Sequence, residues 1–296
     1  MGESESDSTA VYETGMQYFR GGGLPIDHNK AFEHFRQAAD QGLPEAQAEL
    51  ALIYRSKGSF DFLNAADFQQ ATTWAERALQ DGLREKANAG THSAQYELGQ
   101  LYFSGLGVGR DAARAREWYE RAAASGNCDA KRALGFIYLS GDGAEKNVVT
   151  AKKYFEEAAS ANVAPAQVFL GVLYSGGDGI PKDYTKAVEW FRKAADQGSP
   201  GAQDALGVRY EKGQGVPQSY AKAAEYYQQA ADRGFWAGID HLARLYEEGN
   251  GVPKDRAKAA ELYSKLAARK YPEGEKGLKR LRATGGSTTM PLRPPR

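Results

Sequence analysis

The chain is built from one unit that recurs every 36 residues. Tyrosines stand at positions 102, 138, 174, 210 and 246, each 36 residues after the one before, and earlier ones at 18 and 54 share their phase once a short insertion is allowed for. A leucine column keeps the same spacing: Leu50, Leu98, Leu134, Leu170, Leu206, Leu242 and Leu278. A period of this length is typical of stacked supersecondary units that cannot bury a hydrophobic face alone. The sequence therefore predicts a repeat array.

Each unit carries the signals of two short helices. A glycine pair such as Gly141 and Gly143 follows the tyrosine and marks a turn. Next comes a residue whose side-chain oxygen can cap a second helix; these predicted N-caps are Asp27, Asp67, Asp111, Asn147, Asp183, Ser219 and Asp255. The second helix then ends at glycine or asparagine, which adopt the left-handed C′ conformation at little cost, and only Lys270 departs from this pattern. Helices of roughly 12 and 14 residues are not stable alone in water, so stacking must supply the core.

The register slips once, in the second unit. The leucine column steps from Leu50 to Leu98, which is twelve residues more than the period. The positions of Trp74 and Gly82 predict four extra residues near 60–63 and eight near 83–90. We therefore expect a locally distorted second unit.

The shared pattern reads A-x-x-x-L-G-x-x-Y-x-x-G-x-G-V, then D-x-x-x-A-x-x-W-[YF]-x-x-A-A-x-x-G. It resembles the Sel-1-like repeat family, a relative of tetratricopeptide repeats, over residues 10–283. The resemblance implies an all-α superhelical solenoid of about seven two-helix repeats of 36 residues plus a C-terminal capping helix. Residues 1–9 are then expected to form a disordered acidic leader and residues 284–296 a flexible tail rich in Pro and Arg.

The family resemblance also implies a class of function. Family members act mainly as adaptors, among them activators of membrane synthases, parts of quality-control assemblies and bacterial host-interaction factors. The chain is therefore expected to be a non-enzymatic, protein-binding scaffold without a cofactor. A regulatory or activator subunit of a specific enzyme complex is the alternative.

Composition bounds the compartment and the partners. Lys and Arg number 38 against 38 Asp and Glu, a balance that argues against nucleic-acid binding. Residues 254–296 nevertheless carry twelve basic and four acidic side chains, so this basic C-terminal end is either a solvated cap or a contact for an acidic partner or surface. A single cysteine, Cys128, and the lack of a signal peptide or a long apolar run predict a cytoplasmic protein without membrane insertion. Gly2 matches the loose myristoylation pattern, although its acidic neighbours count against lipidation.

The first helix of each unit is expected to line the concave wall, by analogy with tetratricopeptide arrays, so its variable positions indicate where a partner binds. These positions grade from apolar to charged along the chain, and the third to fifth units hold a contiguous apolar stretch. The predicted partner-binding residues are Phe103, Arg132, Phe136, Leu139, Phe169 and Val172. Exposed apolar patches usually mark contact surfaces, but the same side chains could instead be ordinary core.

Three further motifs have weaker interpretations. Pro291, Pro294 and Arg296 fit the P-x-x-P-x-R arrangement of polyproline II ligands for SH3 grooves, against a plain flexible tail. Ser219 and Lys222 form the S-x-x-K motif of penicillin-recognising enzymes, so a β-lactam-interacting hydrolase is a second alternative; no K-T-G or S-D-N motif accompanies it, and Ser219 occupies the N-cap column. The four histidines show no metal-ligand spacing, so no metal site and no catalytic residue are predicted.

Overall fold

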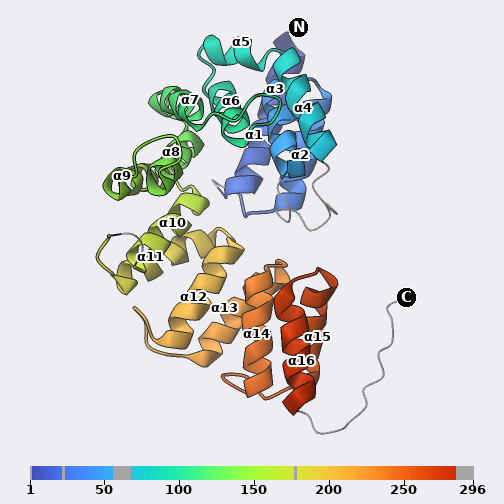
Figure 1. The fold of residues 1–296 in the computed structure, drawn as a ribbon, viewed down its shortest axis with the longest axis vertical. Helices are drawn as coiled ribbons and strands as arrows, with labels where there is room; N and C mark the ends of the chain where they lie inside the picture. The colour runs from blue at the N-terminus through green and yellow to red at the C-terminus, as the bar shows by residue number, and fades with distance from the viewer. Residues whose placement is uncertain (1, 22–23, 56–67, 177–178, 285–296) are drawn as a thin grey trace. The chain divides into compact units, whose positions relative to one another are not determined.

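The computed structural model describes residues 2–21, 24–55, 68–176 and 179–284, and all regular elements within these residues are α-helices (Figure 1). They are α1 (Gly2–Arg20), α2 (His28–Asp40), α3 (Pro44–Arg55), α4 (Phe68–Gln80), α5 (Leu83–Asn88), α6 (His92–Ser104), α7 (Ala112–Ala124), α8 (Cys128–Ser140), α9 (Val148–Ser160), α10 (Ala164–Tyr174), α11 (Tyr184–Asp196), α12 (Pro200–Lys212), α13 (Tyr220–Asp232), α14 (Trp236–Glu248), α15 (Arg256–Ala268) and α16 (Pro272–Thr284). The all-α prediction is confirmed.

The helices pack as consecutive pairs within two compact units, Met1–Ser199 and Pro200–Arg296. Unit 1 holds repeats 1 to 5, which are α1/α2, α3/α4, α6/α7, α8/α9 and α10/α11. Unit 2 holds repeats 6 and 7, α12/α13 and α14/α15, and α16 packs on α15 as the expected terminal helix. We call the first helix of each repeat its inner helix, because inner helices of adjacent repeats contact one another, as α3 and α6 or α12 and α14 do.

The N-terminal end of the array is described from Gly2 onward, and its C-terminal end is described as far as residue 284. The array was predicted to begin at residue 10, whereas α1 begins at Gly2. The predicted tail ligand Pro291, Pro294 and Arg296 lies outside the described residues.

The predicted N-caps hold the second helices in place. Asp111 has extended dihedrals, and its Oδ1 accepts a hydrogen bond from Arg114 N at 2.9 Å. The same cap geometry recurs at Asp27, Asn147, Asp183, Ser219 and Asp255, so six predictions are confirmed, while Asp67 lies outside the described residues. Each cap supplies an acceptor to a helix end that would otherwise lack one.

A glycine of the inner helix and a ring of the second helix form the recurring core contact. The Phe191 ring lies so close to Gly171 that a Cβ there would come within 2.4 Å of Phe191 Cε1. Gly207 has the same relation to Tyr227. The rings themselves are buried, with 2% of Phe191 and 0% of Tyr227 exposed. Glycine at this position allows the close approach of the two helices in repeats 1 and 3 to 6, whereas repeats 2 and 7 have Ala51 and Ala243 there.

The C′ position keeps its left-handed backbone even where glycine is absent. Gly198 has a φ of 87°, and Lys270 reaches 62° at the equivalent place. An L-residue with a Cβ is destabilised in this conformation by about 1–2 kcal/mol. Repeat 7 thus ends like the others, but with strain.

The insertion predicted near residues 83–90 forms the short helix α5, in which Leu83 and Ala87 are buried. It shifts the register of the stack. A Cβ on Gly143 would meet Ala112, the first residue of the preceding second helix, but one on Gly107 would meet Ala75 and Leu79, in the C-terminal half of α4. The turn after α6 therefore packs further along its neighbour than the equivalent turn after α8 does.

Candidate protein-binding surface

Three phenylalanines on successive inner helices form a continuous aromatic row. Phe103 of α6 and Phe136 of α8 have ring centroids 6.2 Å apart at an interplanar angle of 84°, and Phe136 and Phe169 of α10 are 6.3 Å apart at 58°. Phe136 is 39% exposed, and Val172, one turn after Phe169, is 51% exposed. The aromatic row, meaning these three rings, therefore offers an apolar edge to solvent.

The other predicted wall residues are less accessible. Phe169 is half-buried and stacks on the fully buried Phe155 at 4.9 Å, while Phe103 and Leu139 are half-buried against neighbouring core side chains. The predicted wall residues are thus partly surface side chains and partly side chains packed against the core. The contacts of Phe155 and Phe169 fix the row from below.

Arg132 belongs to a different environment from the aromatic row. Its Nη2 donates to the Tyr96 hydroxyl at 3.1 Å, and its Nε lies 3.8 Å from Asp129 Oδ1. Asp129, 3% exposed, also pairs with Arg20 of α1. The guanidinium of Arg132 therefore joins a polar network beneath α1.

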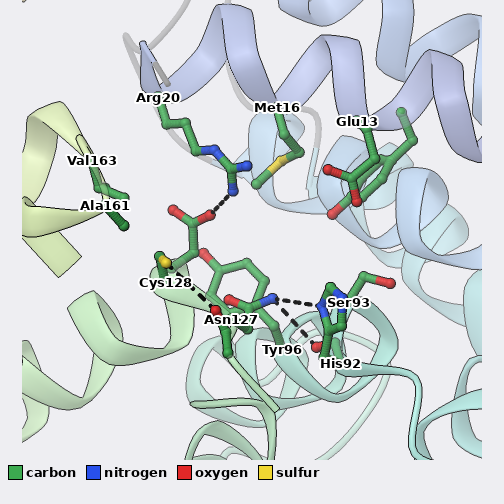
Figure 2. Close-up of a pocket in the computed structure, with 13 residues that line it drawn as sticks. Glu13, Met16, Arg20, His92, Ser93, Tyr96, Asn127, Cys128, Ala161 and Val163 are labelled. Carbon is green, nitrogen blue, oxygen red and sulfur yellow. Dashed lines mark hydrogen bonds and ion pairs between the residues drawn. The ribbon is translucent and has the colours of Figure 1, made fainter. Parts of the chain in front are cut away.

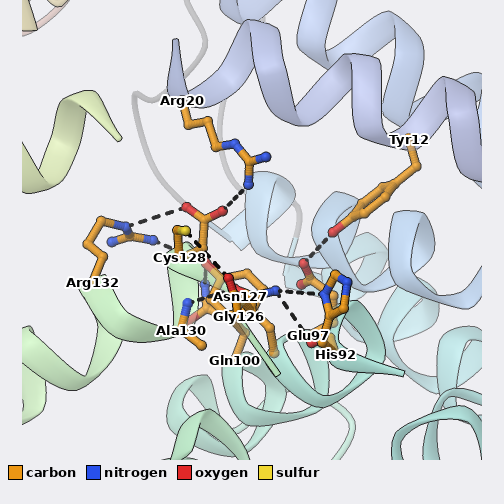
Figure 3. A network of polar contacts seen from close by, with 12 residues as sticks. Tyr12, Arg20, His92, Glu97, Gln100, Gly126, Asn127, Cys128, Ala130 and Arg132 are labelled. Carbon is orange, nitrogen blue, oxygen red and sulfur yellow. Dashed lines mark hydrogen bonds and ion pairs between the residues drawn. The ribbon is translucent and has the colours of Figure 1, made fainter. Parts of the chain in front are cut away.

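This inner network links α1 to helices far along the chain. Besides the Arg20–Asp129 pair, the Tyr12 hydroxyl donates to Glu97 Oε1 of α6 at 2.7 Å (Figure 3). The loop after α1 adds a backbone bond, from Ile26 N to Gln197 O at 3.0 Å. A cavity of about 150 Å³ remains between α1 and the N-terminal ends of α6 and α8, with Arg20, His92, Tyr96 and Asp129 in its wall (Figure 2).

Two buried carboxyl groups lie within the network. Glu49 of α3 is 4% exposed and Glu97 is 0% exposed. Burial raises the pKa of Glu49 to about 7, and the charge of Asp129 acts in the same direction. Burial and then the neighbouring Glu49 also raise the pKa of Glu97. Both groups are held toward their protonated forms, since nearby like charges and low polarity disfavour ionisation.

Sequence reasoning missed this network, although one signal was present. Glu13, Glu49 and Glu97 occupy the same column of three successive units, just before the position of the column leucine. A run of acids in a column that later holds Ala133, Phe169 and Ala205 indicates a local change in the inner wall. What it could not indicate was the approach of α1.

The remaining sequence motifs find structural roles. The Ser219 hydroxyl accepts a hydrogen bond from Lys222 N at 3.3 Å, so the predicted capping role of Ser219 is confirmed. Lys222 itself lies over the Tyr210 ring at 5.3 Å. Within the described residues, no group of three or more His, Cys, Asp or Glu side chains could hold a metal ion, and no helix is long and apolar enough to cross a bilayer.

Comparison with known proteins identifies the repeating unit. The family model described as Sel1 repeat matches residues 8–43, 44–83, 92–127, 128–163, 164–199, 200–235 and 238–271. Among curated proteins, the chain is 31% identical over 101 residues to DAP3-binding cell death enhancer 1 of Rattus norvegicus, covering 34% of this chain and 17% of that protein. It is also 31% identical over 119 residues to the chitin synthase regulator SKT5 of Malassezia restricta, covering 40% of this chain and 8% of that protein. The chain thus spans only a small part of these curated relatives.

Solved structures share the fold along most of the chain. A Sel1 repeat protein from Oxalobacter formigenes superposes with a TM-score of 0.65 at 30% identity, over 78% of this chain and 86% of that one. The protein c5321, a protective antigen of uropathogenic Escherichia coli strains, gives a TM-score of 0.62 at 32% identity, over 95% of this chain and 58% of that one. Yeast Tom70, at 14% identity and a TM-score of 0.56 over 94% of this chain and 64% of that one, is similar in fold alone.

Proposed function

The chain belongs to the Sel1 repeat family, and from that premise we propose that it is a non-enzymatic adaptor that holds a partner's peptide or helix against the aromatic row. Proteins of this repeat type are typically protein-binding and mostly non-catalytic. The observation that carries the proposal is the exposure of Phe136 and Val172 on adjacent inner helices, with Phe136 packed against the half-buried rings of Phe103 and Phe169. Large exposed apolar side chains on a rigid support are the usual anchors of protein interfaces.

The dimensions of the aromatic row suit a regular segment. Its ring centroids are 6.2 Å and 6.3 Å apart. Apolar side chains one turn apart on an α-helix are separated by about 6 Å along its axis, and alternate residues of an extended strand by about 6.6 Å. The guanidinium of Arg110 over the Phe103 ring, 5.6 Å from its centroid, supplies a polar rim at one end. A partner with apolar residues at i, i+4 and i+7, or at alternate positions, would therefore match it.

The proposal is tested by removing the apolar edge without disturbing the fold. We expect Phe136→Asp and Val172→Asp each to lower the affinity for a peptide selected from a displayed library at least tenfold. Val149→Asp is the matched control, because Val149 is 74% exposed on α9, a second helix. Circular dichroism and thermal melting establish that each variant is folded. Equal loss of affinity in the control, or none in Phe136→Asp, would contradict the proposal.

A regulatory subunit of an enzyme complex is a second candidate. It is favoured by the similarity to a chitin synthase regulator, which covers 40% of this chain. Under this alternative the aromatic row would dock on the enzyme itself, and co-purification with an enzyme whose rate depends on the chain would support it. We place either function in the reducing cytosol, because Cys128 has no second cysteine in the chain.

The basic C-terminal end provides a separate proposed contact. Lys276, Lys279 and Arg282 are exposed on α16, whereas Arg280 is engaged with Glu247. An acidic partner surface would be attracted to these exposed basic side chains, and its binding would weaken steeply with rising salt concentration.

A further inference from the structure

A second cavity lies on the side of repeat 3 where the inserted helix α5 meets the turn after α6. Its volume is about 420 Å³. Its wall contains Arg84 of α5, Tyr102 of α6, the turn residues 107–111 and Arg114 of α7. We name it the arginine pocket after Arg84, Arg110 and Arg114, which come from three separate elements.

Two of these arginines occupy columns that are basic in four of the five repeats from the third to the seventh. Arg114 lies over the Tyr102 ring at 5.7 Å, just as Lys186 lies over Tyr174 and Lys258 over Tyr246 in other repeats. Arg110 corresponds to Lys146, Lys182 and Lys254. Taken alone, these two residues would be an ordinary feature of the repeat.

Arg84 makes repeat 3 different. It stands on the insertion, which has no counterpart in the other repeats. The same insertion shifts the 105–111 turn toward the C-terminal half of α4, the helix that α5 follows. The one break in the period thus delivers a third guanidinium to a cavity that already has two.

The pocket retains positive charge after its internal pairs are counted. Arg110 pairs with Asp142, and Arg114 Nε lies 3.5 Å from Asp111 Oδ2. Within the described part of the chain, Arg84 has neither a hydrogen bond nor an ion pair. Three guanidinium groups therefore face two carboxylates. The amide of Arg114 at the start of α7 is already bonded to Asp111, so the side chains rather than the helix end provide the donors.

We infer that the arginine pocket binds a phosphoryl group, either free phosphate or the phosphate of a modified side chain. A phosphate dianion presents three strong acceptor oxygens, and the planar guanidinium fork can donate to two of them at once. Arg110 and Arg114 are 53% and 63% exposed in their side chains, so both can turn toward a ligand. The pocket shares Arg110 with the rim of the aromatic row, but none of its three arginines is an apolar anchor of that row, so failure of the phosphoryl site would leave the adaptor proposal standing.

The test is titration of the full chain with inorganic phosphate and with N-acetyl-phosphoserine amide, followed by calorimetry or NMR shifts at low salt. Arg84→Gln should weaken binding at least tenfold while leaving the melting temperature unchanged, and Arg84→Lys should recover part of the affinity. Lys222→Gln, at the column position of Arg114 in repeat 6, is the control and should bind as the unmodified chain does.

The two ligands distinguish the sources of the phosphoryl group. Tighter binding of the phosphoserine amide would support recognition of a modified protein, and tighter binding of inorganic phosphate would support a free anion. No saturable binding of either ligand up to 10 mM, or equal binding by Arg84→Gln and the unmodified chain, would overturn the inference.

Discussion

Repeats 4 and 5 have apolar inner walls, whereas repeats 6 and 7 have charged ones, although all four share the same helix pair. Behind the apolar walls the second helices carry Phe155 and Phe191; behind the charged walls they carry Tyr227 and Tyr263. The Tyr227 hydroxyl donates to Glu211 at 2.6 Å, and the Tyr263 hydroxyl to Glu247 at 2.9 Å. Replacement of phenylalanine by tyrosine in the core therefore accompanies the appearance of glutamate on the inner helix.

The physical reason is the cost of burying a polar group without a partner. A buried phenolic hydroxyl needs an acceptor, and a glutamate on the inner helix of the same repeat supplies it. Burial raises the pKa of Tyr227, and the bond to Glu211 acts in the same direction, so the phenol remains a donor. Repeat 3 follows the same rule, since Tyr119 donates to Gln100 at 2.6 Å. The core and the wall are thus not independent.

The largest expected effect comes from the core glycine of repeats 4, 5 and 6, a position that Ala243 occupies in repeat 7. Gly171→Ala would place a Cβ 2.4 Å from Phe191 Cε1 and should destabilise the chain by about 2–3 kcal/mol, because overpacked cores must move. Gly207→Ala should behave alike against Tyr227. Urea unfolding measures both. Gly201→Ala is the control: its Cβ would be 3.9 Å from Phe235, so it should be neutral or slightly stabilising.

The carboxyl groups of the two units should respond to pH in opposite ways. The pKa of Glu49 is raised by burial to about 7, so the folded state keeps a proton that the unfolded chain releases near 4.3. Stability from this group is therefore full below about pH 4.3 and is lost as pH rises toward 7, by at most about 1.4 kcal/mol per pH unit for one proton. Urea unfolding from pH 5 to 7 should show this slope, and Glu49→Gln should flatten it.

Glu247 in unit 2 provides the opposite sign. Its hydrogen bond from Arg280 lowers its pKa, so its contribution is present above the unfolded value near 4.3 and is lost only as pH falls below that value. Glu247→Gln should leave the slope between pH 5 and 7 unchanged. A slope that Glu49→Gln did not alter would show that the buried pair is not its source.

Exchanging the core ring tests whether core and wall are coupled. Phe155→Tyr buries a hydroxyl beside apolar wall residues and should destabilise by about 1–2 kcal/mol. Adding Leu139→Glu, which recreates the arrangement of Tyr227 and Glu211, should recover part of that loss. A double-mutant cycle on urea midpoints measures the coupling. Strictly additive effects would mean that the pairing of core and wall residues is incidental.

The smallest expected effect concerns the C′ residue that separates repeat 7 from the others. Lys270→Gly removes a side chain from a backbone with a φ of 62° and should stabilise by about 1 kcal/mol. Gly198→Lys, at a φ of 87° in repeat 5, should destabilise by a similar amount. Thermal melting of the two variants checks both signs.

Sequence reasoning succeeded where the determining interactions are local. Caps such as Asp111 bond to an amide three residues away, and the insertion at α5 follows from counting within one period. The aromatic row required only that neighbouring inner helices be adjacent. The polar network was beyond reach because Tyr12 and Glu97, or Arg20 and Asp129, are brought together by the accumulated rotation of several repeats. Arg84 was missed for a related reason, since the register shift that places it is a property of packing.

The bond between Ile26 N and Gln197 O, at 3.0 Å, bears on how the protein is made. A ribosome adds about 5–20 residues per second, so Gln197 is synthesised roughly 10–35 s after Ile26. During that interval the Ile26 amide lacks its acceptor. Arg20 likewise lacks Asp129 until the fourth repeat has been synthesised. Early repeats can therefore stack as they emerge, but the nascent chain closes unit 1 only when its fifth repeat has left the exit tunnel.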